Sequence, residues 1–350
     1  MEETKILTWE NKKEAVRILK KGGIVAFPTD TVYGLAVISS RPEPYRNLVE
    51  VKRRSPNKPF TLMCGSLGMA AKYVEIDAPA NSVLKKFFPG EVTALLRARK
   101  STKQWVDLGT GVIGIRVPED QNVRALIEEV GVPLLVPSAN ISANPPLTTF
   151  EEVKKEFDGK IDAIIKGECV KNIPSTIVDL TDGISLVREG PVAFEDIVSA
   201  HNDGRLNPLR IALGADHGGF KAKQAIRKHL LESGYEVMDF GTKTTKSCDY
   251  PIYGKAAAEA VSNKLADFGV LVCTSGEGIS IAANKVNGIR CGIGYDDVAT
   301  AKLREHNNAN MVAFGQKYMA LKDILKRVDI FLLENFSSEE KHHRRVSEIG

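Results

Sequence analysis

Apolar positions along the chain follow helical and strand spacings in turn, with few long breaks, which predicts an α/β fold in both halves. Residues 12–21 place Val16 and Leu19 on one helix face, and Gly22-Gly23 would end that helix before a buried strand at 24–27. A strand at 210–213, a helix ended by Gly234 and a strand at 235–240 begin the same alternation again. The order of elements in the second half is that of a doubly wound parallel sheet.

A polar segment at 201–208 separates a short helical pattern from the strand at 210–213. The segment is rich in turn-forming residues, including Asn202, Asp203 and Gly204. The chain has 350 residues, more than one hydrophobic core usually organises. We therefore predict two domains, 1–203 and 204–350.

Composition restricts the class of protein. Hydrophobic residues make up 43% and charged residues 26% of the chain, as in an ordinary globular protein. No uncharged apolar run approaches the roughly 18 residues of a spanning helix, and the N-terminus has no basic stretch leading into an apolar one. The five cysteines form no Cys-x-x-Cys pair, which argues against a disulfide framework and a zinc site. We expect a cytoplasmic protein with no membrane segment and no metal cluster.

Polar and basic side chains in the first half gather where strands and helices are predicted to end. Each group alone is ordinary turn or capping chemistry. Hydroxyls, guanidinium groups and ammonium groups together suit an anionic ligand. Four such segments predict one shared site: 28–34, 52–59, 137–142, and 174–176 with Arg188.

These segments resemble the signatures of the YrdC-like threonylcarbamoyl-AMP synthases: Pro-Thr-(Asp/Glu)-Thr-x-(Tyr/Phe)-Gly, Lys-x-Arg, Ser-x-Asn and Pro-Ser-Thr-(Ile/Val), in that order. The match spans roughly residues 5–200. The resemblance implies a YrdC-like twisted α/β sheet and synthesis of threonylcarbamoyl-AMP and pyrophosphate from L-threonine, bicarbonate and ATP, with Mg²⁺. The product would serve tRNA threonylcarbamoyladenosine modification through a separate transfer complex. By the same resemblance Thr29 and Thr31 would hold threonine or its carbamate, and ATP would be surrounded by Lys52, Arg54, Arg116, Ser138, Asn140, Ser175 and Arg188.

Three positions depart from that family. Glu91 and Ser55 stand where prolines are usual, and Asp120 stands where a histidine is frequent. A carboxylate beside ATP phosphates would oppose binding unless it faced solvent or a metal. Glu91 therefore raises a question about the rate of synthesis more than about the fold.

In the second half, reactive side chains follow the predicted strands. Asp216-His217 follows the first strand, Asp249-Tyr250-Pro251 precedes a helix, and Cys273 begins a glycine-rich loop. Such a loop before a helix can bind an anion, and a thiolate is favoured there. A buried cysteine or a histidine at a helix end is also common structure with no catalytic duty.

The joint order of these residues resembles the RpiB-type ribose 5-phosphate isomerases over residues 209–349. The resemblance implies a Rossmann-like parallel sheet, a homodimer with its pocket between subunits, and exchange of ribose 5-phosphate and ribulose 5-phosphate without a cofactor. Cys273 would move the proton, Ser275 would steady the enediolate, and His306 would assist ring opening. Asp216 and His217 complete the implied catalytic set, and the sugar phosphate would meet Tyr250, Gly276, Gly278, Asn307, Lys317, Lys341 and Arg345.

Several alternatives stay open. Lys317 and Lys341 stand where arginines are usual, and lysine lacks the bidentate fork. Thr274 and Glu277 also differ from the usual loop, so another aldose phosphate is a possible substrate. A different reading makes the first domain an RNA-binding module and the second a non-catalytic dimerising domain. The absence of an aromatic-interleaved basic stretch in the sequence argues against it.

Overall fold

The computed structural model describes residues 3–55 and 58–349, so Pro56 and Asn57 of the predicted 52–59 segment lie outside the described residues. The chain forms two compact units. Unit 1 comprises Met1–Glu75 and Lys86–Ser199, and unit 2 comprises Ile76–Lys85 and Ala200–Gly350.

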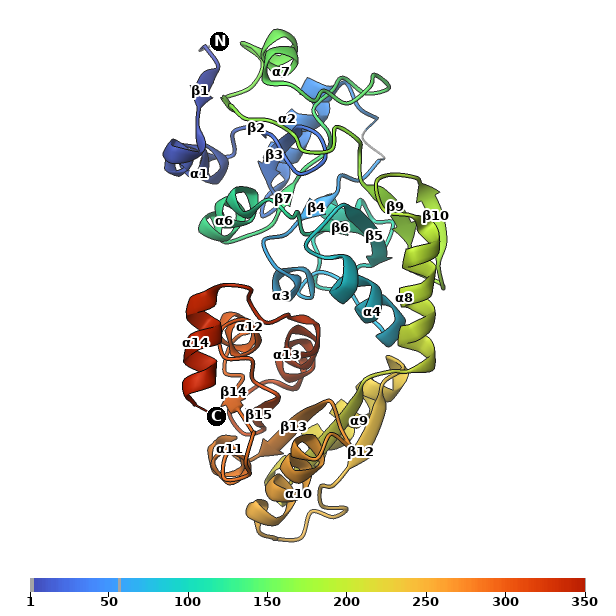
Figure 1. The fold of residues 1–350 in the computed structure, drawn as a ribbon, viewed down its shortest axis with the longest axis vertical. Coiled ribbons are helices and arrows are strands. Elements are labelled where there is room, and N and C mark those ends of the chain that lie inside the picture. Colours follow the sequence, from blue (N-terminus) through green and yellow to red (C-terminus); the bar gives the residue numbers. More distant parts are fainter. Residues whose placement is uncertain (1–2, 56–57, 350) are drawn as a thin grey trace. The chain divides into compact units, whose positions relative to one another are not determined.

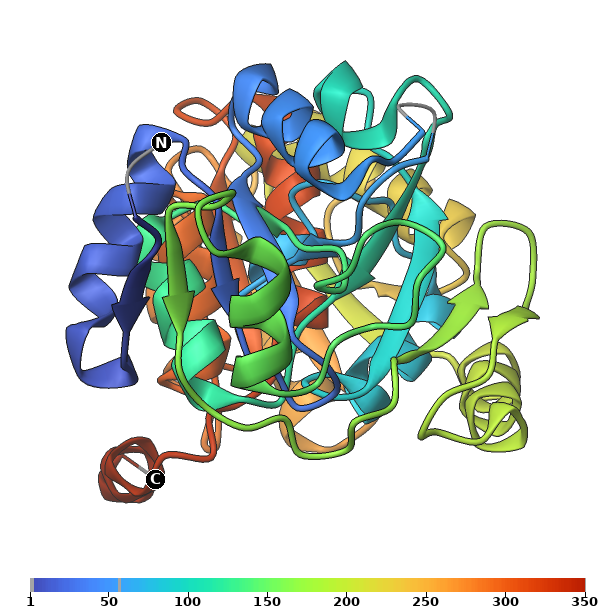
Figure 2. The same ribbon diagram turned by 90° about the horizontal axis from the view of Figure 1, so that it is seen from above.

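Unit 1 is built on a mixed sheet, with ten strands within the described residues (Figure 1). Its strands lie in the order β1 (Lys5–Leu7), β8 (Ala163–Ile165), β2 (Val25–Phe27), β3 (Gly34–Ile38), β7 (Leu134–Leu135), β4 (Leu62–Met63), β6 (Val112–Arg116), β5 (Val92–Arg97), β9 (Thr176–Asp179) and β10 (Ser185–Arg188). The hairpin of β9 and β10 forms one edge, yellow-green in Figure 2, and β1 forms the other.

The helices of unit 1 are α1 (Lys12–Lys21), α2 (Pro42–Lys52), α3 (Leu67–Ala70), α5 (Gln104–Asp107), α6 (Gln121–Val130) and α7 (Phe150–Phe157), with a 3-10 turn η1 (Trp9–Asn11). Helix α4 (Ala78–Phe87) belongs mostly to unit 2, and α8 (Phe194–Leu206) belongs partly to each unit. The prediction for α1 is confirmed: Val16 and Leu19 are buried, and Gly22 ends the helix with φ of 95°. The apolar faces of α1 and α6 pack on the sheet in one core.

The prediction of a turn-rich segment from residue 201 was wrong, because α8 continues to Leu206. Gly204, which suggested a turn, serves close packing instead. A Cβ atom at Gly204 would lie 2.6 Å from Ser82 Cβ and 2.8 Å from the Ala78 carbonyl oxygen. Sequence alone does not distinguish a glycine that bends the chain from one that makes room for a neighbour.

Unit 2 holds a parallel sheet in the predicted doubly wound arrangement. Its strands, five within the described residues, lie in the order β12 (Glu236–Asp239), β11 (Arg210–Ala215), β13 (Phe268–Cys273), β15 (Met311–Gly315) and β14 (Cys291–Ile293). The helices are α9 (Phe220–Glu232), α10 (Tyr250–Ser262), α11 (Glu277–Ala283), α12 (Asp297–Glu305), α13 (Leu321–Leu333) and α14 (Glu340–Glu348), with a 3-10 turn η2 (His217–Gly219).

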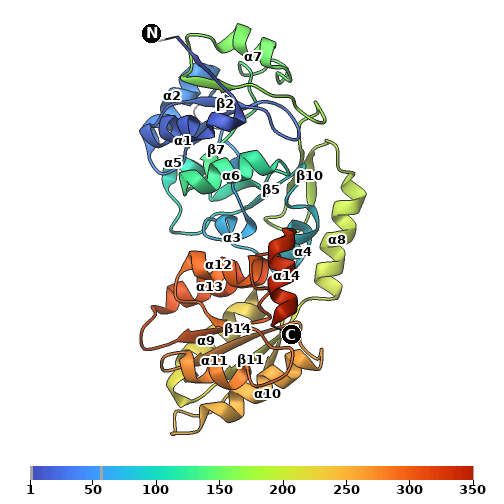
Figure 3. The ribbon, with the colours of Figure 1, turned by 60° about the vertical axis from the view of Figure 1, so that its left-hand side comes forward.

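Two cores cover the two faces of this sheet. Helices α9 and α13 bury one set of strand residues, and α10 and α11 bury the alternate set. Figure 3 shows α12 and α13 on one side of the strands and α10 and α11 on the other. The strand order reverses between β11 and β13, where doubly wound sheets bind ligands. Over the described part of the chain, no helix combines the length and the apolar character that crossing a bilayer needs.

Candidate active sites

A cavity of about 430 Å³ lies in unit 1 beside β4, β5, β6 and β9. Hydroxyls and arginines share its lining with apolar side chains. Among the described residues that line it, none is an aspartate or a glutamate, so the cavity suits an anionic ligand. The predicted residues in its lining are Thr31, Arg54, Arg116, Ser138, Ser175 and Arg188.

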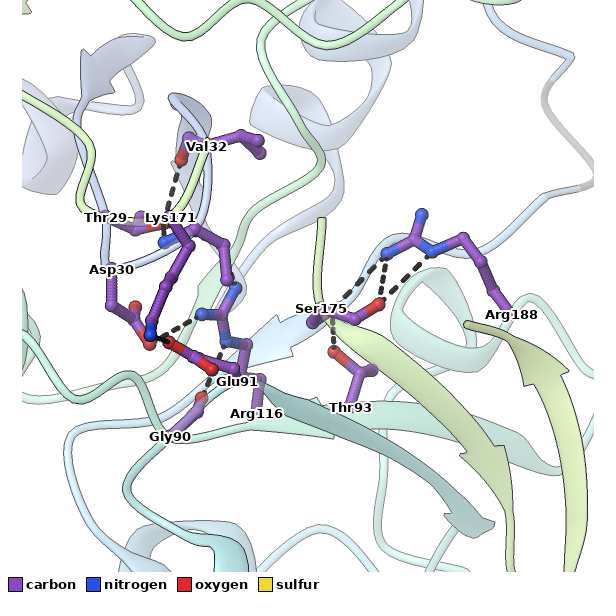
Figure 4. Close-up of polar contacts among 11 residues, drawn as sticks. Thr29, Asp30, Val32, Gly90, Glu91, Thr93, Arg116, Lys171, Ser175 and Arg188 are labelled. Carbon is purple, nitrogen blue, oxygen red and sulfur yellow. Dashed lines mark hydrogen bonds and ion pairs between the residues drawn. The ribbon is translucent and has the colours of Figure 1, made fainter. Parts of the chain in front are cut away.

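Arg116 is the buried centre of a polar network in the cavity wall (Figure 4). Its Nη1 donates to Thr31 Oγ1 at 2.6 Å, and its Nε donates to the Gly90 carbonyl at 3.1 Å. Its Nη2 lies 2.8 Å from Asp30 Oδ2. Thr29 lies behind the lining, with its Oγ1 3.0 Å from that of Thr31. The network fixes the Thr31 hydroxyl at the cavity.

Ser175 and Arg188 form a second cluster, separate from Arg116 in Figure 4. Arg188 Nη2 and Nε donate to the Ser175 carbonyl at 2.8 and 3.2 Å. Thr93 Oγ1 lies 2.8 Å from Ser175 Oγ and also lines the cavity. Thr93 could not be singled out from the sequence, because a threonine in a strand is usually only a good β-former. Its position shortly after Pro89-Gly90 was the available signal.

Lys52 lies behind the cavity and outside its lining, with 1% of its surface exposed. Its ammonium donates to the carbonyls of Ser138 and Asn140 at 2.6 and 2.7 Å and to Asn140 Oδ1 at 3.0 Å. These acceptors match the three protons of an ammonium group. Burial lowers the Lys52 pKa to about 7. In this arrangement Lys52 and Asn140 shape the loop that carries Ser138.

Arg54 is held by the loop that follows α2. Its Nε and Nη2 each donate at 3.2 Å, to the carbonyls of Lys58 and Pro59. The guanidinium also lies 5.0 Å from the centre of the Phe60 ring. Stacking and hydrogen bonds together hold the Arg54 guanidinium group beside the cavity.

Two of the departures from the family, Glu91 and Asp120, have structural explanations. Glu91 is not among the described lining residues, and its Oε1 lies 4.0 Å from Lys171 Nζ. Burial raises the Glu91 pKa. Asp120 caps α6, because its Oδ1 accepts from the backbone nitrogens of Asn122 and Val123 at 2.8 and 3.2 Å. Neither carboxylate faces the cavity.

The side chains of the described residues offer no ready site for Mg²⁺. No group of three or more His, Cys, Asp or Glu residues is placed to hold a metal ion in that part of the chain. Mg²⁺ prefers several oxygen ligands and commonly arrives coordinated to phosphates. An Mg²⁺ ion would therefore enter the cavity together with ATP.

In unit 2, Cys273 ends β13 at the switch point of the sheet. Its Sγ accepts from the Gly276 backbone nitrogen at 3.0 Å, and 4% of the residue is exposed. Gly276 has φ of 91°, a conformation that favours glycine. Ser275 lies between them, and its Oγ accepts from the Glu277 backbone nitrogen at 3.4 Å.

Asp216 and His217 follow β11 beside this loop. Asp216 Oδ1 accepts from the Gly219 backbone nitrogen at 3.1 Å and fixes the turn. His217 Nδ1 accepts from the Cys248 backbone nitrogen at 3.1 Å, and Cys248 Sγ lies 3.8 Å away. The hydrogen bond with the Cys248 side chain is the main cause that raises the His217 pKa. Sequence analysis missed Cys248, although it directly precedes the Asp249-Tyr250-Pro251 segment.

Tyr250 and Lys317 also lie beside the cysteine loop. A Cβ atom at Gly278 would lie 2.7 Å from Tyr250 Cζ, so the tyrosine ring needs a glycine there. The Lys317 backbone nitrogen donates to the Thr274 carbonyl at 3.1 Å. The loop thus brings together predicted residues from three strand ends.

A second group of predicted residues gathers around His306. Its ring stacks on His342 with centroids 4.1 Å apart, and burial lowers its pKa. Lys341 Nζ lies 2.5 Å from Glu339 Oε2, and Asn307 and Arg345 are exposed. Among the described residues, no hydrogen bond or ion pair joins this group to Cys273.

Comparison with known proteins identifies both halves. Residues 17–190 match the Sua5/YciO/YrdC family model, described as telomere recombination, and residues 211–349 match the model described as ribose/galactose isomerase. A putative threonylcarbamoyl-AMP synthase of Methanocaldococcus jannaschii is 33% identical over 197 residues, which are 55% of this chain and 93% of that protein. Ribose-5-phosphate isomerase B of Escherichia coli is 40% identical over 140 residues, which are 40% of this chain and 93% of that protein.

A solved structure extends the match in the first half. The crystal structure of E. coli YciO is 27% identical, with a TM-score of 0.52, and the match covers 56% of this chain and all of YciO, 100%. The predicted pairing of two α/β enzymes is confirmed. The chain belongs to two enzyme families, the Sua5/YciO/YrdC family in its first half and the ribose/galactose isomerase family in its second.

Proposed function

We propose that the chain is a bifunctional cytoplasmic enzyme. The first half makes threonylcarbamoyl-AMP from L-threonine, bicarbonate and ATP, for tRNA threonylcarbamoyladenosine modification through a separate transfer complex. The second half interconverts ribose 5-phosphate and ribulose 5-phosphate. The observation that carries the first assignment is the cavity lined by three arginines and several hydroxyls, with no carboxylate in its described lining.

The chemistry of the first half needs anions to be oriented. The threonine amine adds to bicarbonate with loss of water, and the resulting carbamate oxygen attacks the α-phosphorus as pyrophosphate leaves. Thr31, fixed by Arg116, would bind threonine or its carbamate. Arg54 and Arg188 would spread the negative charge of the polyphosphate, and Ser138 and Ser175 would donate hydrogen bonds. Mg²⁺ would enter with ATP.

Pyrophosphate release tests the first assignment. We expect release that requires threonine and bicarbonate together, and Arg54→Ala should abolish it. Arg46→Ala is the matched control, because Arg46 is an exposed arginine on α2, the helix that precedes Arg54. Equal release without threonine would contradict the assignment. Salt-sensitive tRNA binding without threonine-dependent ATP consumption would favour the RNA-binding alternative.

In the second half, Cys273 would act as the base. Its thiolate would take the proton from C2 of the open-chain aldose and return it to C1, while Ser275 and the loop NH groups steady the enediolate. The Gly276 NH donates a hydrogen bond to this sulfur at 3.0 Å, so the loop holds Sγ in a fixed position. His306 would assist ring opening. Because no hydrogen bond or ion pair among the described residues joins the His306 group to Cys273, we propose that a second copy completes each pocket.

Isomerisation of ribose 5-phosphate tests the second assignment. Cys273→Ala should stop the reaction, and Cys291→Ala should not, although both thiols are buried in strands of the same sheet. An unaffected Cys273→Ala variant would contradict the role of the thiol. Lys317 and Lys341, which replace the usual arginines, favour a second candidate, an isomerase of another aldose phosphate. A panel of aldose phosphates with a higher kcat/KM for a substrate other than ribose 5-phosphate would support it.

A further inference from the structure

Glu91 introduces a carboxylate close to the Arg116 network, and Lys171 is the cation that faces it. Glu91 is mostly buried, with 14% of its side chain exposed, and Lys171 Nζ lies 4.0 Å from its Oε1. We infer that Lys171 is a positioning residue. It neutralises Glu91, so that the Arg116 guanidinium keeps its hydrogen bond to the Thr31 hydroxyl. The inference rests on the proposed synthase activity, because it concerns the same cavity.

The balance of charge explains why such a residue is needed. Arg116 is already paired with Asp30, at 2.8 Å between Nη2 and Oδ2. A second carboxylate at Glu91 gives this buried region two negative groups against one guanidinium. Lys171 supplies the second positive charge. Without it, Glu91 would compete for the guanidinium that donates to Thr31 at 2.6 Å.

The backbone places Lys171 where this role requires it. Its backbone nitrogen donates to the Asp30 carbonyl at 3.1 Å, and the Thr176 backbone nitrogen donates to the Glu91 carbonyl at 2.9 Å. The segment from 171 to 176 is therefore tied at one end to the loop that carries Thr31 and at the other to the start of β5. Ser175, which lines the cavity, lies within this segment. Figure 4 shows Lys171 reaching across to Glu91 beside Arg116.

A double-mutant cycle tests the inference. Lys171→Met should lower kcat/KM for threonine in pyrophosphate release by about two- to five-fold, the modest effect of a half-exposed ion pair. In the Glu91→Gln background the same substitution should change kcat/KM little, because no carboxylate remains to be neutralised. Lys160→Met is the matched control: Lys160 is exposed to a similar degree as Lys171, 47% against 52%, and its pair with Glu156 does not line the cavity.

The thermal midpoint of the same four proteins gives a readout that does not need turnover. Lys171→Met should lower the midpoint of unit 1 more in the wild type than in the Glu91→Gln background. The effects of the two substitutions on the thermal midpoint could depend on each other while none of the four proteins shows threonine-dependent turnover. That result would support the inference and contradict the proposed synthase function. Equal effects of Lys171→Met in both backgrounds, or no effect in either, would overturn the inference.

Discussion

Replacing Arg116 with methionine should destabilise unit 1 strongly. Arg116 and Asp30 are both buried, with 6% and 5% of their side chains exposed, so the substitution leaves Asp30 as an uncompensated charge. Breaking a buried ion pair by removing one partner costs about 3–5 kcal/mol. The lost hydrogen bonds to Thr31 and Gly90 fall within the same estimate. We therefore expect Arg116→Met to lower the free energy of unfolding by about 3–5 kcal/mol.

The assay is urea unfolding followed by tryptophan fluorescence. The sequence has two tryptophans, Trp9 and Trp105, and both belong to unit 1. The signal therefore reports on that unit even though the chain unfolds in more than one step. Arg97→Met is the control, because its pair with Asp182 is exposed and such pairs contribute about 0–1 kcal/mol.

Adding Asp30→Asn to Arg116→Met should recover part of the loss, because the second substitution removes the unpaired charge. The two single effects should therefore not add. Additivity within about 0.5 kcal/mol would mean that the two side chains act independently, and it would refute the reasoning.

Three further predictions concern other parts of the chain. The Lys52 pKa is lowered from 10.5 to about 7, so the unfolded chain binds more protons in this pH window and the stability of unit 1 should rise with pH from 7 towards 10.5. Lys52→Met should remove this contribution, so that the midpoint of the fluorescence transition rises less steeply between pH 7 and 10.5. An unchanged slope of the midpoint against pH would contradict the prediction. Lys341→Arg should lower the KM for ribose 5-phosphate several-fold by restoring a bidentate fork, and an unchanged KM in the steady-state assay would argue against phosphate contact. Gly219→Ala should destabilise unit 2 by about 1–3 kcal/mol, because its Cβ would lie 2.3 Å from the Val272 carbonyl oxygen. Thermal inactivation of the isomerase would measure that loss, and an unaltered inactivation temperature would contradict it.

The elements with a strong periodic pattern could be predicted from the sequence. Helix α1 has the predicted bounds, and the strand predicted at 210–213 extends to Ala215 as β11. The apolar run at 132–136 also predicts a strand, but only Leu134–Leu135 form one, β7, because strand length depends on the neighbours that offer hydrogen bonds. Local pattern carries no information about those neighbours.

Residue types in the candidate site could be predicted better than their contacts. Motif order selected Thr31, Arg54 and Ser175, which line the cavity. The same motifs selected Lys52, but its ammonium is directed at backbone carbonyls, because the fold places the loop at 137–142 beside it. Thr93 was missed, since the sequence does not show which face of β5 borders the cavity.

Transfer of labelled carbon from bicarbonate tests the central claim about the first half most directly. With ¹⁴C-bicarbonate, the wild-type chain should form a labelled adenylate only when threonine and ATP are both present, and Arg54→Ala should form none. Label in an adenylate without threonine, or pyrophosphate release with no label incorporated, would contradict the claim that the arginine-lined cavity joins a carbamate to the α-phosphate of ATP.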